Sequence, residues 1–212
     1  MPLILRIEKT EPPERQALLE AAARASVLAC LDPRAAPGGE WAAAFDDWCA
    51  SRIRKVARRA RGAQWLATAD LPGVTVADGG AQARALVPGR IGDVDRRVNR
   101  LQIGGTELDG ELATAPPEHG LCLWVAPEMP MTVGKLAAQV SHASMLGVRL
   151  VPLGQVDPWY ADGCPLVVRQ AGLPRWARLL TASGEGRAVA VRDAGYTEVA
   201  PGSCTVIADW VD

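Results

Sequence analysis

The sequence predicts an α/β fold, with a four-stranded mixed sheet between helices and an additional α+β region at the N-terminus. First, short apolar runs alternate with helical patterns beyond residue 120, as in folds that layer helices on a sheet. Second, residues 1–112 combine Ala-rich helical segments with short Val-containing pieces broken by glycine pairs. We therefore expect an N-terminal region over 1–112, a linker over 113–119 and a second unit over 120–212.

The composition is that of a globular protein and does not favour a strongly basic or metal-binding one. Of 212 residues, 49% are apolar and 22% are charged, which suits a globular chain with a buried core. A formal net charge of −1 gives no support to a strongly basic nucleic-acid binder. The five cysteines lack Cys-x-x-Cys spacing and only two histidines are present, so we expect neither a metal nor another cofactor. Scattered thiols and the lack of a long apolar run predict a cytoplasmic protein without a membrane span.

The N-terminal region is predicted to begin with a strand and two helices. Residues 3–9 begin apolar and then alternate, as a strand does. Residues 14–30 follow two prolines and are rich in good helix formers. A second helix is predicted from about residue 40 to residue 61. Its large apolar residues share roughly one face: Trp41, Phe45, Trp48 and Ile53.

Basic residues gather near the end of this second predicted helix: Arg52, Arg54, Lys55, Arg58, Arg59 and Arg61. Two interpretations are open, a solvated helix end or a patch that binds the phosphates of a nucleic acid. Further along, residues 75–77 and 83–87 flank a predicted hairpin. We expect the whole of 1–112 to form an α+β subdomain packed on the rest of the chain.

The second unit has a sharper pattern. The continuous apolar run over 121–125 is typical of a strand covered on both faces. Further strands are predicted over 166–168, 188–191 and 205–210, and helices over 133–147 and 174–180.

One helix in this unit carries a polar stripe. Lys135, Gln139 and His142 stand at i, i+4 and i+7, so they share a face of the predicted helix. The stripe is either a solvated surface or part of a site. A lysine in the first turn, where a cation is mildly unfavourable, favours the site. There it could join exposed backbone N–H groups in receiving an anion or a developing oxyanion.

A carboxylate follows one of the predicted strands directly. Asp193 stands at the end of the strand over 188–191, and ligands usually bind at the carboxyl edge of such a sheet. Thr197 and Thr205 bracket the turn that follows and could present hydroxyls nearby. The alternative is that Asp193 caps a turn and the threonines serve strand propensity.

Two segments together resemble a known family. Gly-Lys-Leu-Ala-Ala-Gln-Val-Ser-His-Ala (134–143) is similar to the signature helix of the archaeal/eukaryotic-type (type II) peptidyl-tRNA hydrolases. Arg-Asp-Ala-Gly-Tyr-Thr-Glu-Val-Ala-Pro-Gly-Ser-Cys-Thr-Val (192–206) resembles the family's signature near the C-terminus. The resemblance covers about residues 120–210. It implies a compact α/β domain, often a homodimer, that hydrolyses the ester joining a peptide to tRNA without a metal.

The resemblance also implies roles for individual residues. It implies that the catalytic residues are Lys135, Gln139, Asp193 and Thr197. It implies that substrate is bound by Gly134, His142, Ser203 and Thr205. For His142, a structural role in packing the helix is an open alternative. We hypothesise that Asp193 orients or deprotonates a water molecule while Lys135 stabilises charge. Lys135 and Asp193 should then face each other within about 4–6 Å.

The turn before the signature helix departs from the family. Ala126-Pro127-Glu128 stands where the family usually has Arg-Thr-Asp, and Thr132-Val133 stands where it has Gly-Lys. Because cations for tRNA phosphates are missing there, two alternatives to a peptidyl-tRNA hydrolase stay open. One is a non-catalytic RNA-binding or interaction protein that retains the fold. The other is an esterase that acts on a smaller acyl ester.

Overall fold

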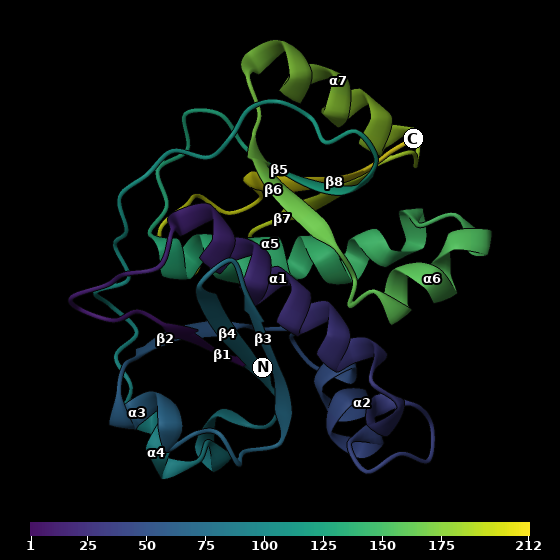
Figure 1. The fold of residues 1–212 in the computed structure, drawn as a ribbon. Helices are drawn as coiled ribbons and strands as arrows, with labels where there is room; N and C mark the ends of the chain where they lie inside the picture. Colours follow the sequence, from purple (N-terminus) through teal and green to yellow (C-terminus); the bar gives the residue numbers. More distant parts are fainter.

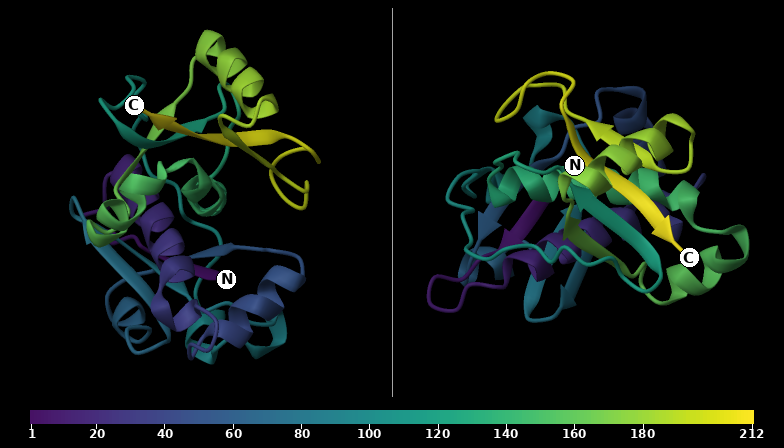
Figure 2. Two further views of the ribbon diagram at one scale, coloured as in Figure 1. Left: turned by 90° about the vertical axis from the view of Figure 1, so that its right-hand side faces the viewer. Right: turned by 90° about the horizontal axis from the view of Figure 1, so that it is seen from above.

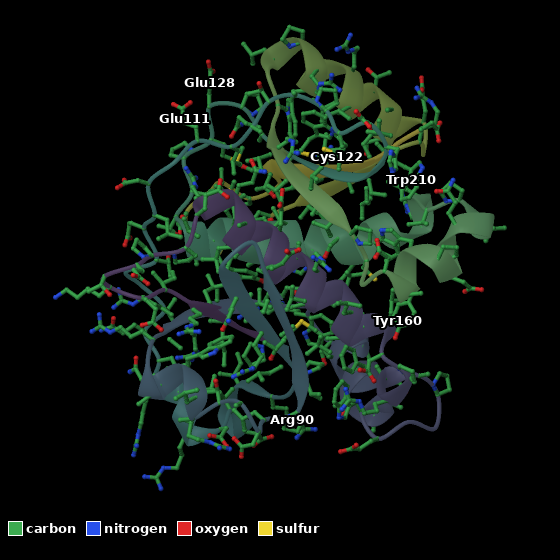
Figure 3. All side chains as sticks on the ribbon, viewed as in Figure 1. Arg90, Glu111, Cys122, Glu128, Tyr160 and Trp210 are labelled. Atoms are coloured by element: carbon green, nitrogen blue, oxygen red, sulfur yellow. The ribbon has the colours of Figure 1, made fainter.

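The computed structural model describes residues 1–212 and contains two four-stranded mixed sheets with two long helices between them (Figure 1). The helices are α1 (Arg15–Leu31) and α5 (Val133–Gly147). A further helix, α7 (Leu173–Gly184), covers the outer face of the second sheet, where Cys122 points toward it (Figure 3). The predicted α/β class is confirmed, including the four-stranded mixed sheet between helices.

The first sheet has the strand order β2-β1-β4-β3. Its strands are β1 (Pro2–Arg6), β2 (Val56–Ala60), β3 (Gly73–Asp78) and β4 (Ala81–Leu86). β1 runs parallel to β2 and antiparallel to β4. Because it is an inner strand of the sheet, Leu3, Ile4 and Leu5 are buried. The predicted hairpin is confirmed as β3–β4, whose two-residue turn, Gly79–Gly80, has positive φ at both positions.

The second sheet has the strand order β6-β5-β8-β7. Its strands are β5 (Gly120–Val125), β6 (Leu166–Gln170), β7 (Val189–Arg192) and β8 (Cys204–Val211). β5 and β7 both pair antiparallel with β8, so they run in the same direction. Their carboxyl ends therefore meet at one edge of the sheet, and α5 begins at that edge.

Small residues let α1 and α5 approach each other closely between the sheets. Ser141 Oγ of α5 donates to the carbonyl of Ala22 in α1 at 3.1 Å, and Ser144 Oγ donates to that of Ala23 at 2.8 Å. The largest hydrophobic cluster holds residues from both sides of the proposed linker. The first residue of the proposed linker is hydrogen-bonded to both parts, because the Ala113 N–H donates to Gln16 Oε1 and its carbonyl accepts from the Gln170 N–H at 2.9 Å. The division at 113–119 stays a prediction.

The short helices lie around this frame, as the two rotated views also show (Figure 2). They are α2 (Ala42–Ala50), α3 (Ala63–Leu66), α4 (Arg96–Asn99) and α6 (Val156–Ala161). Single 3-10 turns stand at Pro33–Ala35, Ile91–Asp93, Val148–Leu150 and Leu153–Gln155. None of these helices, short or long, has the length and apolar character needed to span a bilayer.

The prediction of a single helix from about residue 40 to residue 61 is wrong. Only Ala42–Ala50 is helical, and Val56–Ala60 is strand β2, which pairs with β1 along its whole length. The buried β1 needs hydrogen-bonding partners on both sides, and this pairing outweighs the helical propensity of the Arg-rich segment. The cations at 52–61 therefore do not form a helix end.

Candidate active site

The N-terminus of α5 is capped from two sides. Thr132 Oγ1 accepts a hydrogen bond from the Lys135 N–H at 3.2 Å, as an N-cap residue does. The Gly134 N–H donates to the hydroxyl of Thr106 at 3.0 Å. A Cβ on Gly134 would lie 3.0 Å from that same oxygen, so a glycine suits this contact. These two N–H groups therefore already have acceptors within the protein, and an anion at this helix end stays a prediction.

Lys135 and Asp193 face each other across the carboxyl edge of the second sheet. Lys135 Nζ donates to Asp193 Oδ2 at 2.5 Å, and each side chain is 10% exposed. Lys135 Nζ also donates to Thr197 Oγ1 at 3.0 Å. The predicted approach of these groups is confirmed, and it follows from the parallel course of β5 and β7.

A chain of hydrogen bonds continues from Asp193 into the core. Gln139 Nε2 donates to the same carboxylate oxygen, Asp193 Oδ2, at 2.7 Å. The buried Thr205 hydroxyl donates to Gln139 Oε1 at 2.6 Å, which fixes the orientation of the amide. Thr205 is buried and does not line the pocket, so its predicted contact with substrate stays a prediction. Its side chain acts on Gln139 instead.

The loop after β7 is shaped around the backbone of Asp193. The Gly195 N–H donates to Asp193 Oδ1 at 2.7 Å. Gly195 has φ +76°, and a Cβ there would lie within 2.6 Å of Pro201 atoms, so only glycine fits. The Asp193 N–H donates to the Ser203 carbonyl at 2.9 Å. Ser203 therefore supports the loop through its backbone and does not line the pocket, and its contact with substrate stays a prediction.

These contacts set the charge of the carboxylate. Burial acts to raise the pKa of Asp193, but the hydrogen bonds from Lys135, Gly195 and Gln139 and the nearby ammonium outweigh it. The pKa of Asp193 is therefore lowered, and the group is ionised at neutral pH.

A pocket of about 490 Å³ opens over these groups. Six of the predicted site residues line it: Gly134, Lys135, Gln139, His142, Asp193 and Thr197. Residues 53–57 and Ile103 of the N-terminal region complete the lining together with α5 and the loop after β7. No group of three or more His, Cys, Asp or Glu side chains is arranged to hold a metal ion.

His142 meets a cation from the N-terminal region. Its Nδ1 lies 3.0 Å from Lys55 Nζ, which donates to the ring when the ring is neutral. Burial and the neighbouring Lys55 lower the pKa of His142 to about 3, so the ring is neutral. Burial also lowers the pKa of Lys55 to about 7. This pair lies in the pocket between the Lys135 end of α5 and Leu146.

The other cations of the basic cluster have separate local contacts. Arg52 donates to the Tyr196 hydroxyl at 2.8 Å, and the Arg54 guanidinium lies 4.3 Å from the centre of that ring. Arg58 donates to the carbonyls of Asn99 and Leu101. Arg59 bonds Gln102 and the Gly105 carbonyl, while Arg61 is exposed. Arg52 and Arg54 thus tie the N-terminal region to the loop that carries Asp193 and Thr197.

Sequence reasoning missed three contributors to the site. Glu198 accepts from both the N–H and the hydroxyl of Thr132 at 2.7 Å, which joins the start of α5 to the loop after β7. Its place in the second signature segment was a usable signal. Thr106 carried no such signal, and Lys55 was named only as one of the basic cluster, because each reaches the site through the packing of the N-terminal region.

The turn before α5 departs from the family motif in sequence, and its polar side chains have contacts or positions of their own. Glu128 is exposed, has φ +55° and points away from the molecule (Figure 3). The Thr132 hydroxyl accepts from the Lys135 N–H and donates to Glu198, so both of its roles are within the protein. The cations that the resemblance implies for this turn are replaced by Ala126 and Val133, both of them buried.

Comparison with known proteins agrees with this geometry. The family model described as peptidyl-tRNA hydrolase PTH2 matches residues 120–209. A protein of Schizosaccharomyces pombe named "Probable peptidyl-tRNA hydrolase 2" is 33% identical over 104 residues, which cover 45% of this chain and 50% of that protein. A protein of Haloquadratum walsbyi named "Peptidyl-tRNA hydrolase" is 34% identical over 84 residues, which cover 38% of this chain and 75% of that protein.

The match places the family in the second half of the chain. This chain spans about half the length of the S. pombe relative but three quarters of the H. walsbyi relative. Both signature segments, with Lys135 and Asp193, fall inside the matched residues. The chain belongs to the peptidyl-tRNA hydrolase PTH2 family.

Proposed function

We propose that this protein hydrolyses the ester bond between peptide and tRNA in peptidyl-tRNA, with water as the nucleophile. The observation that carries the proposal is the placement of Asp193 in the pocket. One oxygen of its carboxylate accepts from Lys135 and Gln139, and Thr197 stands beside the lysine. The names of the two relatives support the same substrate class.

In this mechanism the Asp193 carboxylate orients a water molecule toward the ester carbonyl carbon. A carboxylate with a lowered pKa is a weak base, so its main contribution is orientation, helped by the Thr197 hydroxyl. The Lys135 ammonium stabilises the negative charge that develops on the carbonyl oxygen. The bond from the carbonyl carbon to the ribose oxygen then breaks. Water supplies hydroxide to the acyl group and a proton to the ribose oxygen.

Gln139 and Thr205 keep this arrangement in one geometry. The amide of Gln139 has one productive orientation, because its oxygen accepts from Thr205 and its nitrogen donates to Asp193. A catalytic carboxylate held from several sides needs little reorganisation during the reaction. We assign Gln139 to the positioning of Asp193 and substrate, and Thr205 to the positioning of Gln139.

The second candidate function is RNA binding without catalysis. The altered turn before α5 favours it, because Ala126 and Val133 stand where the resemblance implies an arginine and a lysine that would hold tRNA phosphates over the catalytic groups.

Our proposal of peptidyl-tRNA hydrolysis also includes a cytoplasmic location, where tRNA is used, and a homodimer. Size-exclusion chromatography with light scattering tests the dimer directly. The basic residues Arg52, Arg54 and Arg61 are the candidates for tRNA phosphate contacts.

The test is turnover of N-acetyl-aminoacyl-tRNA and of the same tRNA with a free amino group on its amino acid. We expect the purified protein to release the N-acetylated amino acid, and Lys135→Ala to slow this release. Binding of tRNA without cleavage would support the second candidate function. A folded protein that neither cleaves nor binds either tRNA would overturn both.

A further inference from the structure

The pocket combines convergent polar groups with a set of apolar side chains, most of which come from a different part of the chain. The polar side holds Lys135, Gln139, Asp193 and Thr197, all within the part that matches the family. The apolar side holds Ile53, Val56 and Ile103, all from the N-terminal region, together with Leu146 near the end of α5.

These apolar side chains are exposed to solvent in the pocket. Ile53 is 42% exposed, Leu146 is 47% and Ile103 is 59%. Five of the ten large apolar or aromatic residues that are exposed line this one pocket. Single exposed apolar residues are ordinary, but a group of them beside convergent polar groups marks a ligand-binding site.

The length of the pocket suits an extended acyl chain. Lys135, Gln139, His142 and Leu146 line it from successive turns of α5. Eleven residues separate the first from the last, which corresponds to about 16 Å along the helix. An extended peptide covers this distance with about four to five residues. An ester held at Lys135 could therefore place its acyl part along the helix toward Leu146.

We propose that Ile53, Val56, Ile103 and Leu146 form an acyl-binding subsite that selects esters whose acyl part carries apolar side chains. The inference rests on the proposed function and adds a substrate preference to it. The N-terminal region, outside the family match, is then the part of the protein that determines this preference.

Two acyl groups of similar shape and no charge test the subsite. N-acetyl-leucine and N-acetyl-asparagine are attached to the same tRNA, and kcat/KM for hydrolysis is measured for each. One methylene in an apolar pocket changes kcat/KM by about 10-fold or more, so we expect at least that preference for leucine. Equal values for the two esters would overturn the subsite.

Variants assign the preference to the apolar side of the pocket. Ile53→Asn and Ile103→Asn should each reduce the leucine preference to about threefold or less, and Ile53→Val should retain it. Because both positions are exposed, the fold should survive, and thermal unfolding checks this. The matched control is Leu153→Asn, since Leu153 is 95% exposed and lies outside the pocket. A preference unchanged in both asparagine variants would contradict the assignment.

A binding measurement separates this inference from the proposed function. The probes are 3′-amino-3′-deoxyadenosines whose 3′ nitrogen carries N-acetyl-leucine or N-acetyl-asparagine as a stable amide, titrated by calorimetry. Tighter binding of the leucyl compound by about 10-fold, lost in Ile53→Asn, supports the subsite even if no ester is cleaved. Equal affinities overturn the subsite even if peptidyl-tRNA is cleaved.

Discussion

The family-matched residues 120–209 and the N-terminal region 1–112 contribute to the pocket in different ways. The matched part supplies the charged and hydrogen-bonding groups around Asp193, whose positions follow from the course of β5, β7 and α5. The N-terminal region supplies apolar side chains, Lys55 and the Thr106 hydroxyl. Under the proposed function, the shared motif carries the reaction, while residues outside it shape the space that substrate enters.

The largest expected effect is on the family-matched side of the pocket. Asp193→Ala and Lys135→Ala should each slow single-turnover hydrolysis of N-acetyl-aminoacyl-tRNA by about 10²-fold or more, the scale of an acid–base or oxyanion group. The matched control is Arg187→Ala, which breaks the exposed ion pair with Glu185 and should leave the rate unchanged. Either active-site variant with a rate within threefold of wild type would place the reaction elsewhere.

The next largest effect is expected at Thr205, which bonds Gln139 in the family-matched part of the chain. Thr205→Val removes the hydrogen bond to Gln139 and leaves a buried amide oxygen without a partner, which costs about 1–3 kcal/mol. If Thr205 positions Gln139, kcat should fall about 10-fold with little change in KM, and Thr205→Ser should restore it. Thr181→Val is the control, since Thr181 is exposed on α7. A loss of stability with normal kcat would reduce Thr205 to a structural role.

The difference between the two regions also explains what the sequence could predict. The bounds of α5 and the meeting of Lys135 with Asp193 depend on local patterns and on a strand order that the resemblance supplies. β2 was mistaken for helix because its pairing with β1 joins residues more than fifty positions apart. Thr106, Ile53 and Ile103 reach the site through the same long-range packing, which no local pattern encodes.

A pH-dependent effect is expected at Lys55, on the N-terminal side of the pocket. Burial lowers the pKa of Lys55 to about 7 in the folded protein, against about 10.5 in the unfolded chain. Between these values the unfolded state binds more protons, so the stability of wild type should rise with pH. Urea unfolding at pH 6.5, 8 and 9.5 should show wild type gaining stability relative to Lys55→Met. A constant difference between the two proteins would mean that Lys55 titrates normally.

The smallest effect is expected where the two regions touch at the surface. Tyr196→Phe removes the hydrogen bond from Arg52 but keeps the ring under Arg54, so kcat/KM should change by about twofold or less. Tyr196→Ala also removes the stacked ring and should cost about two- to fivefold. Steady-state kinetics on the same tRNA distinguishes the two. A larger loss in Tyr196→Phe than in Tyr196→Ala would contradict this account of the contact.

The central claim is that Lys135 and Asp193 act as one unit, and a double-mutant cycle on single-turnover hydrolysis tests it most directly. Groups that act together are strongly non-additive. Lys135→Ala combined with Asp193→Ala should therefore lose little beyond the slower single variant, within about threefold. Losses that multiply, so that the double variant is slower than either single one by about a further 10²-fold, would show that the two residues act independently and would contradict the claim.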